Sequence, residues 1–67
     1  MNIDFQFNSS MLSNASYNTE TSELTVTFTN GKVYVYVDVS RDIWDSLISA
    51  RSAGAYFNSI KKELKVK

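Results

Sequence analysis

The sequence predicts an α+β domain in which a small antiparallel β-sheet is covered on one face by two C-terminal helices. Residues 24–36 alternate apolar and polar side chains around an Asn-Gly pair, which is typical of a β-hairpin. Residues 43–48 and 53–60 instead repeat their apolar side chains at helical spacing. Because the expected strands all precede the expected helices, with no βαβ alternation, the sheet should be antiparallel.

The expected strands follow in chain order. Residues 3–7, Ile-Asp-Phe-Gln-Phe, alternate apolar and polar side chains and predict a short first strand. Residues 14–18 predict a weaker second strand, and the polar run at residues 18–22 predicts the turn after it. The central hairpin should then occupy about residues 23–29 and 32–38.

The Asn30-Gly31 pair sets the register that we expect for this hairpin. A two-residue type I′ turn at these residues pairs Val26 with Val35 and Thr27 with Tyr34. One face of the hairpin is then apolar and carries Leu24, Val26, Phe28, Val33, Val35 and Val37. The other face carries Thr25, Thr27, Thr29, Lys32, Tyr34 and Tyr36. We expect the apolar face to pack against the helices and the tyrosine face to meet water or a ligand.

Two helices are expected at about residues 41–50 and 53–62, with Ser40 and Ser52 as their N-caps. Residues 61–67 alternate charged and apolar side chains, and two interpretations stay open. They either finish the second helix or form a short edge strand with its apolar side chains inward and its lysines guarding the edge. The helical side chains expected to cover the hairpin are Trp44, Leu47, Ile48, Phe57 and Ile60.

The composition limits the chemistry that this chain can perform. Sixty-seven residues form one domain, residues 1–67, and a core of that size gives marginal stability. The absence of histidine and cysteine excludes ordinary zinc sites and Ser–His or Cys–His catalytic pairs. We therefore expect no enzyme and no cofactor. Asp42 and Asp45, neighbours on a helix, leave metal-assisted activity as an alternative.

Size and location give two further expectations. A small domain without disulfides often gains burial from a partner subunit, which favours a homo-oligomer. No signal peptide and no membrane-spanning run is visible, so we expect a cytoplasmic protein, in the host cytoplasm if a phage encodes it.

The formal net charge is zero, but the charges are unevenly distributed. All charged residues before Lys32 are acidic, whereas basic residues outnumber Glu63 from Arg51 onward. A basic end can bind an anion or can simply solvate a helix end. Arg51 and Ser52 lie between the expected helices, where a helix N-terminus could hold a phosphate or Ser52 could act only as a cap.

A candidate ligand face consists of Tyr34 and Tyr36, flanked by Thr25, Thr27 and Lys32. Aromatic side chains on a sheet stack nucleic-acid bases, at roughly 1–3 kcal/mol per base. In the alternative interpretation, the tyrosines pack beneath a loop, another strand or a neighbouring subunit.

Three segments of the chain resemble one known family. They are Ser9-Ser10, then Leu24-x-Val26-x-Phe28-x-x-Gly31-x-x-Tyr34-x-Tyr36, and finally Ser52-x-Gly54-x-Tyr56-Phe57-Asn58. Together with their spacing over about residues 9–62, they are similar to the KTSC domain. That family is named for an appendage at the C-terminus of some lysyl-tRNA synthetases and also occurs as short bacterial and phage proteins. Ser40 departs from the family pattern, which has proline there, and a helix N-cap tolerates this change.

The resemblance implies a fold and suggests RNA binding, although the family has no established activity. On the matching positions, binding would fall on Tyr34, Tyr36, Ser52, Gly54, Tyr56 and Asn58. We therefore expect a non-enzymatic module that binds RNA or a nucleotide, with charge from Lys32, Arg51, Lys61 and Lys62. One alternative is a homo-oligomeric phage-type protein that sequesters a small signalling nucleotide to counter host defence. Another is a protein-interaction adaptor that buries the tyrosine face against a partner.

Overall fold

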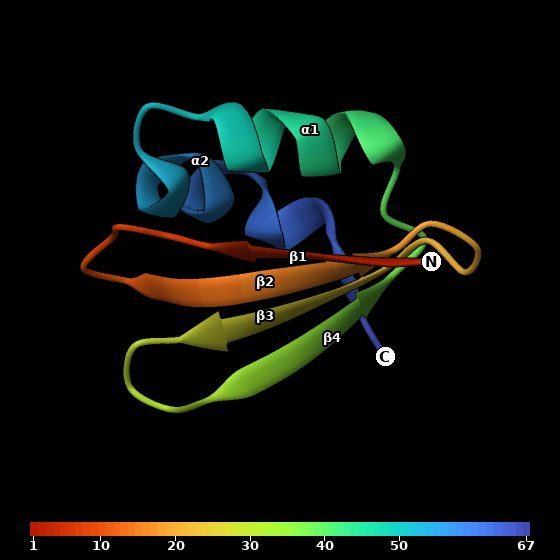
Figure 1. Cartoon of the computed structure of the whole chain (residues 1–67), viewed down its shortest axis with the longest axis horizontal. Helices are drawn as coiled ribbons and strands as arrows, with labels where there is room; N and C mark the ends of the chain where they lie inside the picture. The colour runs from red at the N-terminus through yellow and green to blue at the C-terminus, as the bar shows by residue number, and fades with distance from the viewer.

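The computed structural model describes residues 1–67 and has the α+β architecture expected from the sequence. Figure 1 shows one twisted sheet with both helices on the same face. All neighbouring strands are antiparallel, and they are ordered as in the sequence. The strands are β1 (Asn2–Gln6), β2 (Leu12–Asn18), β3 (Glu23–Phe28), β4 (Val33–Val37) and β5 (Lys65–Val66). The helices are α1 (Arg41–Ser49), α2 (Ala53–Ile60) and the short 3₁₀ helix η1 (Lys61–Glu63).

Both predicted helix starts are confirmed. The Ser40 hydroxyl accepts a hydrogen bond from the Ile43 amide, and the Ser52 hydroxyl accepts one from the Ala55 amide, each at 3.3 Å. The two hydroxyls thereby cap amides of the first helical turn, and the Ile43 amide also donates to the Ser40 carbonyl at 3.1 Å. Neither helix has the length and hydrophobicity that crossing a lipid bilayer requires. After η1 the chain forms the edge strand β5, but Val66 is 60% exposed rather than turned inward.

β4 pairs with β3 one residue away from the predicted register. Val26 lies opposite Tyr34, where the sequence predicted Val35. Since neighbouring side chains on a strand point to opposite faces, this shift turns every β4 side chain over. The predicted faces of β4 are therefore wrong, because Tyr36 is only 6% exposed whereas Val33 is 55% exposed. The face away from the helices carries Val33, Val35 and Val37 beside Thr25 and Thr27.

A longer turn than predicted causes the shift. The Phe28 amide donates to the Lys32 carbonyl at 2.9 Å, so residues 29–31 connect the two strands. A type I′ turn needs positive φ at both central residues, but only Gly31 has it, at 91°. A glycine of this conformation at the end of a three-residue loop is typical of a turn that finishes in a β-bulge.

Contacts from another part of the chain hold this turn in place. The Thr29 amide donates to the Met11 carbonyl at 3.0 Å, and its hydroxyl donates to the Ser10 carbonyl at 2.9 Å. Thr29 therefore bonds to the β1–β2 turn instead of to Lys32 across the hairpin. Because these partners lie far away in the sequence, the Asn-Gly pair alone could not reveal the register.

The core lies between the sheet and the helices. Its largest fully buried side chain, Trp44 of α1, stacks on Tyr17 with ring centroids 5.5 Å apart and planes 12° apart. Tyr36 takes the place that the sequence assigned to the β4 valines. The buried hydrophobic residues are Leu12, Ala15, Tyr17, Leu24, Val26, Tyr36, Val39, Trp44, Leu47, Ala53 and Phe57.

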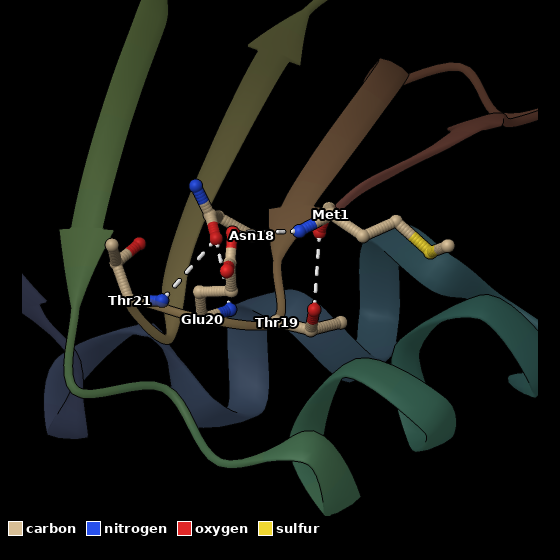
Figure 2. A network of polar contacts seen from close by, with 5 residues as sticks. All are labelled: Met1, Asn18, Thr19, Glu20 and Thr21. Carbon is tan, nitrogen blue, oxygen red and sulfur yellow. Dashed lines mark hydrogen bonds and ion pairs between the residues drawn. The ribbon is translucent and has the colours of Figure 1, made fainter.

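The start of β1 is tied to the β2–β3 turn (Figure 2). The Met1 carbonyl accepts bonds from the Thr19 amide at 3.0 Å and from the Thr19 hydroxyl at 3.2 Å. The Asn18 side-chain oxygen accepts from the Glu20 and Thr21 amides, which closes the turn. These bonds position β1 at one edge of the sheet.

Tyr17→Phe is expected to lower the free energy of unfolding by about 1–3 kcal/mol, because it leaves a buried carbonyl without its partner. The Tyr17 hydroxyl donates to the carbonyl of fully buried Val39 at 2.7 Å. Urea denaturation measures the loss. Tyr56→Phe is the matched control, since the half-buried Tyr56 side chain makes no hydrogen bond. Equal losses in the two variants would contradict the role of the Tyr17 bond.

Candidate functional site

A cleft of about 480 Å³ opens between the β1–β2 connection and the junction of α1 with α2. Residues 5–10 line it from the sheet side, and Leu47, Ile48 and residues 50–53 line it from the helix side. In Figure 1, α1 runs above β1 and leads into α2 at the end where β1 turns into β2. The volume is in the range of pockets that take a small organic ligand.

The charge of this cleft is positive. Arg51 is exposed on its rim and makes no ion pair, and no acidic side chain lines the cleft. The first turn of α2 also lacks an acidic residue, whereas α1 carries Asp42 there. Outside the helices and strands, no hydrogen bond involves the amides of Ala53 and Gly54, which are the first two residues of α2. The positive end of α2 is therefore uncompensated, and it lies beside an arginine.

The opposite wall of the cleft is aromatic. Phe5 and Phe7 are half-buried, and their rings meet edge to face with centroids 5.1 Å apart. Sequence reasoning placed both on one face of a strand but did not assign them to a site. The available signal was their alternation on an N-terminal strand, but nothing in that pattern shows that the strand lies beside the helix junction.

Two of the family-like segments meet next to the cleft. The Ser9 hydroxyl accepts from the amides of Met11 at 3.1 Å and Leu12 at 3.2 Å, so it shapes the β1–β2 turn. A Cβ atom added to Gly54 would lie 3.4 Å from both the Ser9 hydroxyl and the Met11 Cβ. These distances are ordinary van der Waals contacts, so the start of α2 packs against this turn with room for little more than a methyl group at Gly54.

The remaining predicted site residues lie elsewhere. Tyr56 is half-buried on α2, Asn58 is exposed on the same helix, and Lys61 is exposed in η1. Thr25 and Thr27 lie on the sheet face away from the helices, and Lys32 lies at the β3–β4 turn. The predicted ligand residues therefore form several groups, of which only Arg51 and Ser52 line the cleft.

The tyrosine pair points toward the helices and does not form an open platform. Tyr36 contacts Phe57 with ring centroids 5.7 Å apart, and Tyr34 contacts Phe28 at the same distance. Burial, assisted by the neighbouring Tyr34, raises the pKa of the Tyr36 hydroxyl above its usual value. Only Tyr34, at 39% exposure, keeps a substantial part of its ring in solvent.

Acidic side chains do not gather into a metal site. Asp45 accepts an ion-paired hydrogen bond from Arg41 at 3.2 Å, and Asp42 lies in the first turn of α1. The chain has no group of three acidic, histidine or cysteine side chains that could hold a metal ion. A second hollow, of about 400 Å³, has Asp38 and Glu63 in its lining with Lys65, so it suits an anion less well than the Arg51 cleft.

The family model of the KTSC domain matches residues 8–63, which is most of the chain. The chain belongs to the KTSC domain family. A protein of Tsukamurella paurometabola is 35% identical to this KTSC domain over 54 residues, which cover 81% of each chain. The crystal structure of a KTSC domain protein from Yersinia pestis superposes with a TM-score of 0.91. It covers 100% of this chain and 96% of the other at 22% identity, a likeness that concerns the fold.

Proposed function

We propose that this KTSC domain is a non-enzymatic module that binds a nucleotide or RNA through the cleft at the α1–α2 junction. One observation carries the proposal. The cleft combines an unpaired arginine, the uncompensated start of α2 and two phenylalanines, without an acidic side chain among them. A phosphate would contact Arg51 and the amide of Ala53, and a base would pack against Phe5 or Phe7.

In this cleft, the aromatic contact with a base comes from other residues than the sequence predicted. The sequence assigned stacking to Tyr34 and Tyr36, but Tyr36 lies in the core. Phe5 and Phe7 replace them in the proposal. The proposal that the domain binds without catalysing a reaction rests on the side chains that line the cleft. The only ionisable one is Arg51. Arginine stays protonated at neutral pH and does not transfer protons.

The size of the cleft favours a ligand unit of about one nucleotide. Lys61 and Lys62 follow the far end of α2, about 14 Å or more along the helix axis from Ser52. A mononucleotide on Arg51 would not span that distance, whereas an RNA strand could contact both ends of α2. Comparing AMP with a single-stranded RNA octamer therefore separates a small-nucleotide site from an RNA site.

Arg51→Ala is expected to weaken binding of the better of these two probes about tenfold, which corresponds to one lost charge-assisted contact. The measurement is an amide chemical-shift titration, in which the Ala53 amide should move most. Arg41→Ala is the matched control because Arg41 is also an exposed arginine, but it pairs with Asp45 and lies outside the cleft.

Two outcomes would defeat the proposal. In the first, Arg41→Ala weakens binding as much as Arg51→Ala, which indicates unspecific attraction. In the second, neither probe moves the Ala53 amide. For the octamer, the logarithm of the affinity should also fall linearly with the logarithm of the salt concentration, since phosphate contacts release counterions.

A further inference from the structure

The outer edge of β1 is an unpaired strand edge. The Thr19 amide bonds to the Met1 carbonyl, and the Phe7 amide bonds to the Ser13 carbonyl. Antiparallel pairing repeats every second residue, so the odd-numbered residues of β1 direct their backbone groups toward β2. The even-numbered residues direct their backbone groups outward. None of these residues takes part in a hydrogen bond outside the helices and strands. These residues are Asn2, Asp4 and Gln6, and all three are exposed.

This edge has little of the protection that edge strands usually carry. It contains no proline, its pairing with β2 is regular from Asn2 to Gln6, and β2 is its only strand neighbour. The one charge on it is Asp4. An exposed edge of this length is a template for another strand, and a charged side chain is a common way of limiting that pairing.

A second copy of the same strand fits this edge in one antiparallel register. Outward-facing residues must meet outward-facing residues, and the fullest overlap places Asn2 opposite Gln6 of the other copy. The amide side chains of that pair can bond to each other on the open face. On the helix face, Ile3 then lies opposite Phe5 of the other copy, a pairing of a β-branched with an aromatic side chain that stabilises sheets.

Only one pair in this register is unfavourable. Asp4 lies on the two-fold axis and faces its own copy, so two carboxylates oppose each other. Ser16 is its neighbour on β2, and Asp4 takes part in no ion pair that would neutralise it. Sliding one copy of β1 by two residues along the other separates the two carboxylates. It also removes one of the three pairs that the outward-facing residues form between the copies.

We infer that the outer edge of β1 is a strand-pairing surface for a second copy of this chain, and that the Asp4 pair keeps this association weak. Asn2 and Asp4 lie outside the cleft, whereas Gln6 lines it, so association is measured without nucleotide or RNA and its test does not depend on the proposed ligand. A pairing limited to one strand edge buries less surface than a stable dimer needs, so the association should depend on concentration in the micromolar to millimolar range.

The test is sedimentation equilibrium over that concentration range. Asp4→Asn is expected to lower the dimer dissociation constant by on the order of fivefold, because it removes one like-charge pair. Asp42→Asn is the control, since it removes an exposed carboxylate from α1 and should leave association unchanged. An equal mixture of Asp4→Lys with the unaltered chain should associate more tightly than either protein alone.

Proline variants show whether β1 is the surface involved. Gln6→Pro in the Asp4→Asn background removes an outward amide and keeps the β1–β2 bonds, so it should abolish dimerisation. Asn2→Pro removes the outward amide at the other end of β1. It replaces Gln6→Pro in the test if circular dichroism shows that Gln6→Pro is unfolded. The inference is overturned if Asp4→Asn associates no more than Asp42→Asn, if the charge-swapped mixture gains nothing, or if a folded proline variant still dimerises.

Discussion

Trp44→Ala is expected to lower the free energy of unfolding by about 3–5 kcal/mol. The Trp44 side chain is fully buried and stacks on Tyr17, so truncation removes its contacts and leaves a cavity beneath α1. A domain of this size has about 3–10 kcal/mol of stability in total, at the usual contribution per residue. The variant should therefore lose a large share of the total stability and unfold at a clearly lower temperature.

Far-UV circular dichroism during thermal and urea denaturation measures this effect. Trp44→Phe is the graded control, because a phenyl ring keeps part of the stacking on Tyr17 and fills part of the space. Its loss should fall between zero and that of the alanine variant. A cooperative transition of Trp44→Ala at the temperature of the unaltered protein would show that α1 does not depend on this contact.

The second large effect concerns the strand that the sequence placed in the wrong register. Tyr36→Ala is expected to lower the free energy of unfolding by about 3 kcal/mol or more, because Tyr36 is buried against Phe57. Val35→Ala should cost less than about 1 kcal/mol, since Val35 is half-exposed on the open face. Urea denaturation of the two variants gives the comparison.

The order of these two losses distinguishes the registers directly. In the predicted register Val35 lies in the core and Tyr36 in solvent, so the loss for Val35→Ala would be the larger. Tyr34→Ala adds an intermediate case, because Tyr34 is 39% exposed and contacts Phe28 at its edge. A larger loss at Val35 than at Tyr36 would overturn the pairing of β4 described above.

The candidate site was only partly visible in the sequence. Arg51 and Ser52 were recognisable because Ser52 precedes a run of residues with helical periodicity, so a cap next to a cation followed from local rules. Phe5 and Phe7 were recognisable as one face of a strand. Their position beside Arg51 depends on how α1 and α2 pack on the sheet, and no local pattern encodes that distance.

The sequence by itself determined the order and type of the main elements, both helix caps and the membership in the KTSC domain family. Periodicity and capping act between residues that are close in the chain, so they can be read without coordinates. Only the tertiary structure decided which face of β4 is buried. The turn, held by the bonds from Thr29 to Ser10 and Met11, is one residue longer than predicted, and one residue is enough to exchange the two faces of a strand.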